Sequence, residues 1–394
     1  MLKRLSPFVV VFALLLAACG AGAQNGETTT TTVPEITTTT QPPTTTTTTV
    51  PPIATTTVPG ALTWDVERFG DATVYWEPAV PENIRGTFRL VFGLAKQMAE
   101  RAGFVFDPEI YVAATSQTVF RLQTEVFGIT EEVAIQKTNR ARGFAIYKQN
   151  RMVLNLPAMW RAAEEDMDAM PGEIAHVSLH EWYHLMQERL ANGMQAAAVH
   201  ATLPSWMIEA SADFGAHLEL RRYFCEQDNS APCSDAQLLP YLRDLGAQQL
   251  AQGNTYSPMF VYWVEATGRA DAVDEFFRLL GTHFERNPGA LPRAVYDEYL
   301  RLGSDKTFTQ ELVNQLGEEL GRQPTDPEIL AALIRHIVTP YLGAGLPDAA
   351  YQEAFYAPWT QTLEALLGIP YEEILQRQEA YFAELASARL PGQP

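Results

Sequence analysis

Cysteine, positively charged residues and long apolar runs are all scarce in this sequence, and these scarcities limit the partners and the kinds of structure that it can have. Its 394 residues include 3 cysteines, and 28 Lys and Arg stand against 47 Asp and Glu, for a formal net charge of −19. A surface this acidic argues against nucleic acid as a partner, because it repels phosphate. After Leu16, no apolar stretch reaches the roughly 20 residues of a transmembrane helix. We therefore expect no membrane span in the rest of the chain.

The first 19 residues are typical of a bacterial lipoprotein export signal. Lys3 and Arg4 precede an apolar run, residues 8–16, that is too short for a permanent span. Leu16-Ala17-Ala18-Cys19 then resembles a lipobox, in which cleavage leaves Cys19 as a lipid-carrying N-terminus. We expect an exported protein, lipid-anchored at the outer face of the cytoplasmic membrane or in the cell envelope, with this lipid as its only membrane contact. The alternative is an ordinary signal peptide with a coincidental cysteine.

Residues 20–60 are predicted to form a disordered stalk. From residue 27 on they are almost entirely Thr and Pro, a composition that cannot bury enough apolar area to fold. In polyproline form, at about 3.1 Å per residue, the stalk could hold the folded part on the order of 100 Å from the membrane.

The remaining residues, roughly 330, are enough for a large core. Short runs rich in Val, Tyr and Ile predict strands at residues 72–76, 109–113, 143–147 and 151–156, the last two as a hairpin. Apolar spacing predicts helices at residues 87–102, 115–126, 171–192, 205–223, 258–266, 272–280, 309–320, 326–341, 358–367 and 371–388. The sequence therefore predicts an α+β fold with a mixed N-terminal sheet and a mainly helical C-terminal half. We find no internal repeat.

Cys225 and Cys233 are the two cysteines that remain after lipidation of Cys19. An even number in an exported chain favours a disulfide, here closing a short polar loop. The alternative is two free thiols. Their spacing does not indicate a metal site.

The segment His180-Glu181-Trp182-Tyr183-His184 carries the strongest chemical signal. On a helix, His180 and His184 lie one turn apart on the same face, so both imidazoles can reach a single Zn²⁺. Glu181 lies beside them, close enough to take a proton from water without binding the metal. The alternative is a pair of histidines at the polar edge of an amphipathic helix.

The next predicted helix offers a third ligand. A catalytic zinc has three protein ligands and an open fourth position, and Glu209 follows His184 by a loop long enough to bring a second helix back. Asp213 lies one turn further on the same face. Metal-bound histidines usually donate their second N–H to a carboxylate, and Asp213 is the candidate acceptor for His180. Without the histidine motif, Glu209 and Asp213 would be two acids on an ordinary helix.

This combination resembles the gluzincins, the zinc peptidases typified by thermolysin. The likeness spans roughly residues 65–285 and is specific at residues 173–217, where the pattern W-x-x-E-x-x-A-D-F follows H-E-x-x-H. It implies a thermolysin-like zincin core at residues 61–285, whose sheet edge holds the substrate. The helical patterns that follow predict a helical C-terminal subdomain at residues 286–394. The likeness also implies one catalytic Zn²⁺ on His180, His184 and Glu209, with Glu181 as general base.

A weaker likeness begins at Tyr256, where a tyrosine precedes an apolar helix and a glycine. In the family, such a tyrosine stabilises the oxyanion, so Tyr256 is the candidate here, ahead of Tyr262 and Tyr183. The alternative is a core tyrosine opening a buried helix. The sequence departs from the aminopeptidase branch, because residues 153–157 lack its amine-binding glutamate. By analogy, Asn155 on that strand could bond a substrate backbone.

Two more histidines stand one turn from the motif residues. His176 precedes His180 and His217 follows Asp213, and each could line the cleft or bind substrate. The alternative is a histidine that supports the ligands or lies at the edge of the core. The other histidines, His200, His283 and His336, are interpreted as structural.

We therefore expect a zinc metallopeptidase that hydrolyses peptide bonds of a peptide or protein substrate outside the cytoplasmic membrane. Two alternatives remain open. One is a binding or adhesion lipoprotein on an inactive peptidase fold. The other is an envelope protein with a structural zinc, which would require a fourth protein ligand such as His176.

Overall fold

The computed structural model describes residues 62–146, 149–191, 205–229, 232–286 and 291–387. It is an α+β fold, 71% helical, with a five-stranded mixed sheet on the N-terminal side, which confirms the predicted fold class. The export signal, Cys19 and the stalk lie outside the described residues. Within the described part, no helix is long and apolar enough to cross a membrane.

The sheet has the order β1-β2-β3-β5-β4. Its strands are β1 (Asp65–Phe69), β2 (Ala72–Trp76), β3 (Glu109–Ala113), β4 (Gly143–Ile146) and β5 (Arg151–Asn155). The three inner strands are parallel, and the two edge strands pair antiparallel to their neighbours. The predicted hairpin is formed by β4 and β5. Because β5 also pairs with β3, it is an inner strand, and β4 is an edge strand. The sequence pattern did not predict β1.

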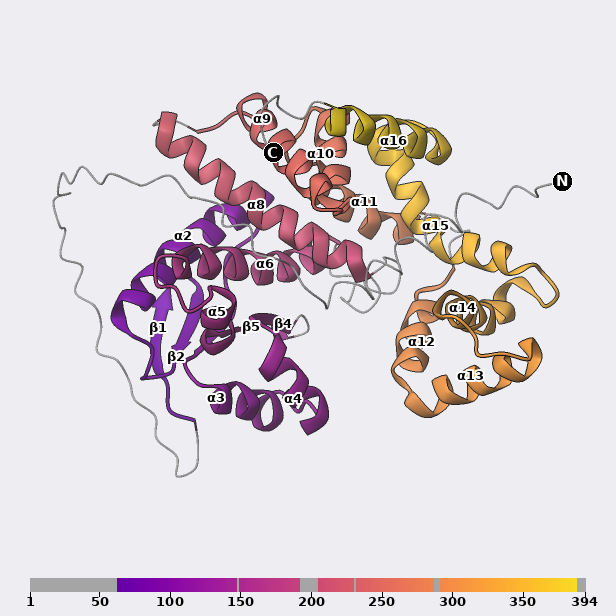
Figure 1. The fold of residues 1–394 in the computed structure, drawn as a ribbon, viewed down its shortest axis with the longest axis horizontal. Coiled ribbons are helices and arrows are strands. Elements are labelled where there is room, and N and C mark those ends of the chain that lie inside the picture. Colours follow the sequence, from indigo (N-terminus) through magenta and orange to yellow (C-terminus); the bar gives the residue numbers. More distant parts are fainter. Residues whose placement is uncertain (1–61, 147–148, 192–204, 230–231, 287–290, 388–394) are drawn as a thin grey trace.

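The other regular elements of the described chain are helices (Figure 1). In chain order they are α2 (Glu82–Ala102), α3 (Ser116–Arg121), η1 (Leu122–Val126), α4 (Glu131–Arg140), α5 (Leu156–Ala162), α6 (Met170–Leu190), α8 (Ser205–Asn229), α9 (Asp235–Ala251), α10 (Tyr256–Thr267), α11 (Ala272–Arg286), α12 (Arg293–Ser304), α13 (Lys306–Leu320), α14 (Asp326–Leu342), α15 (Asp348–Leu367) and α16 (Tyr371–Ser387). The prediction missed α4, α5, α9 and α12. The first two are short, and α9 contains an internal proline, Pro240, a residue that normally argues against a helix interior.

Helix α6 lies at the centre of the main core, between the sheet and α8 (Figure 1). Pro171 suits its first turn, because proline has no N–H to leave unpaired there. The middle residues of its motif, Trp182 and Tyr183, are both buried and serve packing. Gly215 on α8 permits the close approach of the two helices, since a Cβ there would lie 2.4 Å from the Tyr183 ring.

A second hydrophobic core lies under α12, α13, α14 and the first half of α15. The second half of α15 and helix α16 pack instead against the main core, through residues such as Trp359, Leu363 and Tyr381. Helix α15 therefore contributes to both cores, and the C-terminal hundred or so residues do not pack as one separate body.

Cys225, near the end of α8, and Cys233, just before α9, form the predicted disulfide. Their Cα atoms are 6.0 Å apart, within the normal range for a bridge. The bridge joins two helices of the main core at a point away from the predicted ligands.

Candidate metal centre

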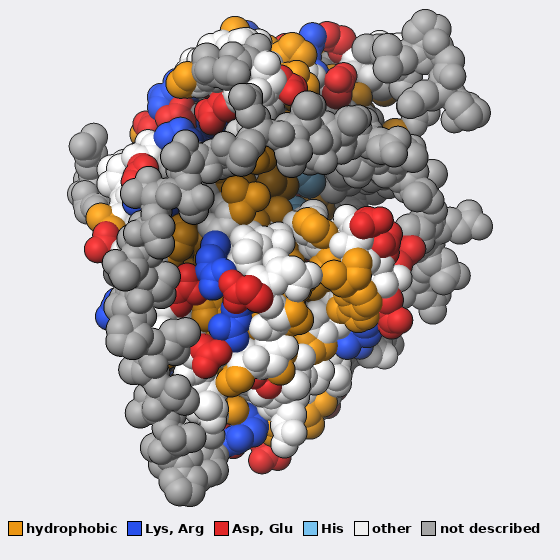
Figure 2. All heavy atoms as spheres, turned by 90° about the vertical axis from the view of Figure 1, so that its left-hand side faces the viewer, with side chains coloured by type: hydrophobic (Ala, Val, Ile, Leu, Met, Phe, Trp, Pro, Cys, Tyr) orange, Lys and Arg blue, Asp and Glu red, His pale blue; other side chains and the backbone are white. Residues whose placement is uncertain are grey.

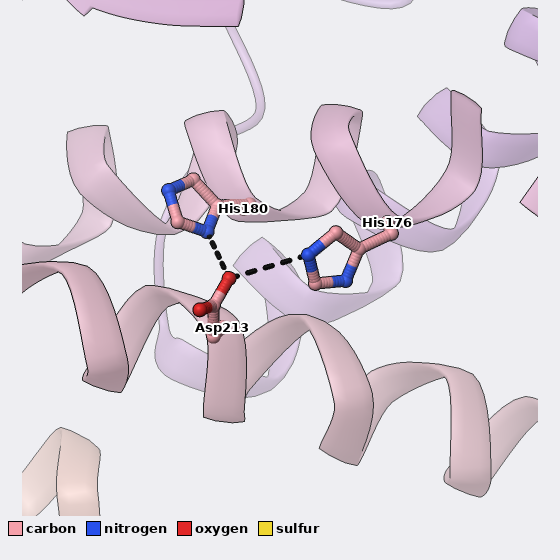
Figure 3. Close-up of side chains that lie close together, drawn as sticks. All are labelled: His176, His180 and Asp213. Atoms are coloured by element: carbon pink, nitrogen blue, oxygen red, sulfur yellow. Dashed lines mark hydrogen bonds and ion pairs between the residues drawn. The ribbon is translucent and has the colours of Figure 1, made fainter. Parts of the chain in front are cut away.

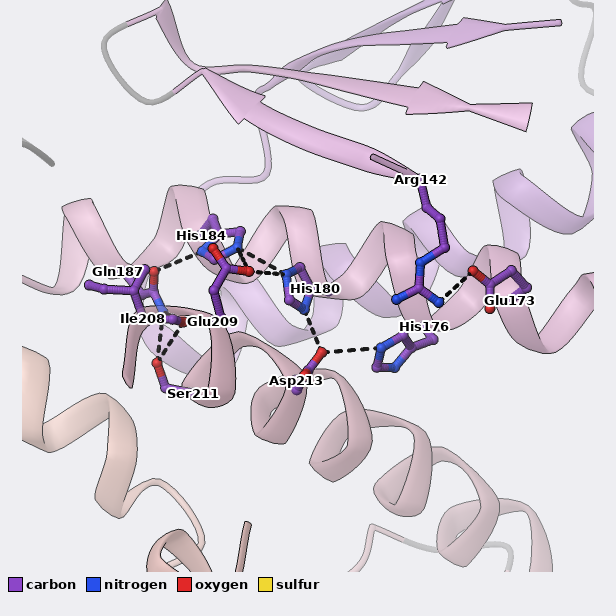
Figure 4. A network of polar contacts seen from close by, with 10 residues as sticks. All are labelled: Arg142, Glu173, His176, His180, His184, Gln187, Ile208, Glu209, Ser211 and Asp213. Carbon is purple, nitrogen blue, oxygen red and sulfur yellow. Dashed lines mark hydrogen bonds and ion pairs between the residues drawn. The ribbon is translucent and has the colours of Figure 1, made fainter. Parts of the chain in front are cut away.

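Helices α6 and α8 run side by side and bring the three predicted ligands together (Figure 4). The Nε2 atoms of His180 and His184 are 3.0 Å apart. Glu209 Oε2 lies 3.3 Å from the first of these nitrogens and 3.5 Å from the second. The two imidazoles are largely buried, whereas the Glu209 side chain is 62% exposed. Three donor atoms therefore converge at the end of an opening to solvent.

The spacing of these atoms fits a single zinc ion. With zinc–ligand distances of about 2.0–2.1 Å, neighbouring ligands of a tetrahedral ion lie roughly 3.3–3.4 Å apart. Two of the three separations match this value closely and the third is slightly shorter. Two histidines and one glutamate are also a donor set of catalytic zinc sites, which leave the fourth position open.

Asp213 orients His180 (Figure 3). Its Oδ1 lies 2.7 Å from Nδ1 of His180, so it accepts the Nδ1–H bond and leaves Nε2 facing Glu209. Burial by itself would lower the pKa of His180, but hydrogen bonds to Asp213 and Glu209 raise that pKa to about 10. A metal ion that takes these atoms replaces the proton on His180, so binding releases a proton.

Both carboxylates are held in the ionised form that metal binding requires. Although burial acts in the opposite direction, hydrogen bonds from His180 and His184 hold the pKa of Glu209 well below its usual range. The same is true of Asp213, whose pKa is lowered, against burial, by hydrogen bonds from His176 and His180. The electrostatics of the site therefore favour a cation between these groups.

Gln187 orients His184 in the same way, and the sequence reasoning missed it. Its Oε1 accepts from Nδ1 of His184 at 3.0 Å. Its Nε2 donates to the carbonyl of Ile208 and to Ser211 Oγ, both at 2.8 Å, which fixes which end of the amide faces the imidazole. The available signal was spacing, because Gln187 lies three residues after His184 and so on the same side of α6.

Gln187→Leu is expected to weaken zinc binding by about 10- to 100-fold. The change keeps the buried volume but leaves the His184 Nδ1–H without its acceptor, so the ring is no longer held with Nε2 toward the metal. Competition with a chromophoric chelator measures the affinity, and the melting temperature measures any loss of stability. Gln248→Leu, at an exposed position of α9, is the matched control. Unchanged affinity in Gln187→Leu would show that the bond does not orient the ligand.

A second group of potential ligands, His176, His180 and Asp213, lies beside the first (Figure 3). Its shortest separation, 2.7 Å between Asp213 and His180, is a charge-assisted hydrogen bond and too short for two ligands of one zinc. His176 Nε2 lies 3.2 Å from Asp213 and does not belong to the group around Glu209. His176 therefore supports Asp213, and it is not a fourth ligand. His217 packs against the His176 ring, with centroids 5.0 Å apart, and burial followed by the nearby His176 lowers its pKa to about 4.

Glu181 lies beside the ligands and faces the edge strand β4. Its side chain is buried, and burial raises its pKa, which makes the carboxylate a stronger proton acceptor. The contact with β4 occurs at Gly143, where a Cβ would lie 2.7 Å from Glu181 Cγ and 2.9 Å from Val177 Cγ1. Only glycine allows the strand to come this close.

A cleft of about 310 Å³ opens between β4 and the two helices. Its lining includes His180, Glu181, Glu209 and Asp213 on the helix side, and residues 140–143 on the other. On the face shown in Figure 2, histidine side chains are visible in a hollow, among hydrophobic and charged side chains of both signs. The cleft thus joins the donor atoms, the buried carboxylate and the free side of a β-strand.

Of the two residues expected to contact the substrate, Asn155 is excluded by its burial and Tyr256 stays a prediction. Asn155 cannot bind a substrate backbone, because it is fully buried and donates to the carbonyls of Thr138 and Ala141 at 3.0 and 2.8 Å. Its strand β5 lies inside the sheet, and the edge beside the cleft is β4. Tyr256 is not among the described residues that line the cleft; it opens α10 and packs against the main core, so its role as oxyanion donor remains only a prediction.

Searches against family models, curated proteins and solved structures find no match to this chain.

Proposed function

We propose that this protein is a zinc-dependent peptidase. The observation that carries the proposal is the convergence of two histidine Nε2 atoms and one glutamate oxygen within 3.5 Å of one another, beside a buried glutamate and an open cleft. A site with three protein donors and access from solvent is the arrangement used for hydrolysis, whereas structural zinc sites are closed by four protein ligands.

Bound zinc would polarise a substrate carbonyl and lower the pKa of water at the site. Glu181 is placed to accept the proton that water loses and to pass it to the leaving amine. Asp213 and Gln187 keep the two imidazoles in the required tautomer. The free side of β4 offers unpaired backbone groups to which an extended peptide can add as a further strand.

We further propose a thermolysin-like core for residues 61–285 and action outside the cytoplasmic membrane. The first is supported by the order of elements, a mixed sheet followed by the motif helix α6 and then by α8 with the third ligand. The second rests on residues 1–60 of the sequence. The proposal of a peptide or protein substrate is supported by the edge strand β4, whose first residue, Gly143, lines the cleft.

Removal of the metal is the direct test of this function. The purified protein is expected to contain about one zinc per chain, to lose hydrolysis of a peptide library when treated with a chelator, and to regain it when zinc is restored. Elemental analysis gives the stoichiometry, and mass spectrometry of the library gives the cleavage. His184→Ala should abolish both, because it removes a ligand. Full cleavage by chelated protein would contradict the proposal.

A further inference from the structure

The two sides of the cleft carry opposite charges. The helix side presents Glu181, Glu209 and Asp213, while the side formed by the end of α4 and the start of β4 presents Arg140 and Arg142. These arginines belong to a chain with a formal charge of −19. Cations gathered in a cleft of an acidic protein attract anionic ligands to that point.

The acidic residues of the cleft are engaged with partners other than the two arginines. Glu209 contacts the imidazoles of His180 and His184. Asp213 contacts His180 and His176, and Glu181 is buried against Gly143. The carboxylates that line the cleft therefore do not neutralise the positive charge on the β4 side, and Arg142 is paired instead with Glu173, which lies outside that lining.

Arg142, the residue just before β4, extends toward the start of α6, next to His176 (Figure 4). Its Nη1 donates to Glu173 at 2.9 Å, and its side chain is 45% exposed. A guanidinium has five N–H donors in a planar fork, so this bond leaves donors for a carboxylate from a ligand. Lys137, one turn before Arg140 on α4, lies 5.2 Å from the Phe144 ring of β4 and is not among the residues that line the cleft.

The position of Arg142 sets its distance from the reacting bond. Its partner Glu173 precedes His180 by seven residues on α6, which is about 10 Å at roughly 1.5 Å per residue. An extended peptide advances about 3.3 Å per residue. A ligand group at Arg142 would therefore lie about three residues from the bond at the metal.

We propose that the cleft selects peptides carrying a carboxylate about three residues from the scissile bond, bound by Arg142 and Arg140. This rests on the proposed peptidase function and adds a substrate class to it. The carboxylate is either an acidic side chain or the C-terminus of the peptide. Arginine suits either source, because its fork matches a carboxylate in two parallel hydrogen bonds.

The test compares matched peptides on the full protein. Each set contains a peptide with Glu, its Gln counterpart, and both again with an amidated C-terminus. We would measure kcat/KM with zinc-loaded wild type and binding by fluorescence anisotropy with zinc-loaded Glu181→Gln. The same measurements on Arg140→Gln/Arg142→Gln show the contribution of the arginines. Arg161→Gln, exposed on α5 and outside the cleft lining, is the matched control.

The expected preference for the carboxylate peptide is about 10-fold or more in both measurements. It should fall to about 2-fold or less in the double variant, with zinc content and the neutral peptides unchanged, and persist in Arg161→Gln. A preference for the Glu peptide over its Gln counterpart shows that the arginines bind an acidic side chain. A preference that is lost when the C-terminus is amidated shows that they bind the C-terminal carboxylate. Equal use of charged and neutral peptides by wild type, or a preference that survives in the double variant, overturns the inference. Preferential binding without any turnover would reject the peptidase function and leave the inference standing.

Discussion

Glu181→Gln is expected to lower peptide hydrolysis by about 100- to 10,000-fold while the protein still binds zinc. Glutamine has the same shape, but it cannot accept a proton from water. Glu181 is not one of the three converging donors, so the ligand set stays intact. Burial raises the pKa of Glu181, which suits a group that must take up a proton and give it away in the same cycle. Single-turnover cleavage of a fluorogenic peptide, with zinc content determined on the same sample, measures both parts of the prediction.

The control for this variant is Glu188→Gln, on the same helix but outside the cleft lining. It makes the same chemical change on α6 and should leave hydrolysis within about 2-fold of wild type. If Glu181→Gln retained wild-type turnover, Glu181 would not be the general base. If it instead lost zinc, the carboxylate would have to be assigned to metal binding.

Gly143→Ala is expected to lower kcat by about 100-fold with little loss of zinc. The added methyl group would lie 2.7 Å from Glu181 Cγ and 2.9 Å from Val177 Cγ1, distances that real Cβ contacts do not reach. Either β4 moves away from α6 or the Glu181 side chain turns aside. A displacement of about 1 Å at a reacting group costs on the order of 100-fold. Steady-state kinetics and zinc titration separate the loss of base positioning from loss of the metal.

Gly93→Ala on α2 is the matched control, because nothing lies within 4 Å of a Cβ at that position. It is expected to leave kcat unchanged and to raise the stability slightly, since alanine is favoured over glycine inside a helix. Wild-type activity in Gly143→Ala would mean that the edge strand can retreat without disturbing the base, and that the close approach is a packing feature alone.

Local patterns were enough for the strands and helices whose periodicity is strong. Strands β2 and β3 and the β4–β5 hairpin are where the sequence places them, because alternating or continuous apolar residues select strand geometry directly. Helices α4, α5, α9 and α12 were missed. Helices α4 and α5 are short and α9 contains Pro240, and packing against neighbours, which a local window does not contain, stabilises these helices.

The prediction that Asn155 contacts the substrate is wrong for a related reason. The analogy with the family predicts Asn155 on an edge strand that binds substrate. Which strand of a hairpin lies at the edge depends on what pairs with its other side, and here β3, more than 35 residues earlier in the chain, pairs with β5. That pairing buries Asn155 and leaves β4 facing the cleft.

The sequence alone determined that His180 and His184 share one face of a helix with Glu181 beside them. One turn of helix brings residues four apart onto one face whatever surrounds it. The same regularity pairs Glu209 with Asp213 on the next helix. Only the tertiary structure decided that α8 lies against α6 in the register that sets Glu209 3.3 Å from His180, that Ile208 and Ser211 of α8 fix the amide of Gln187, and that Gly143 brings an edge strand onto Glu181. These contacts join segments that are distant in the chain, so they depend on how whole elements pack and not on the spacing within any one of them.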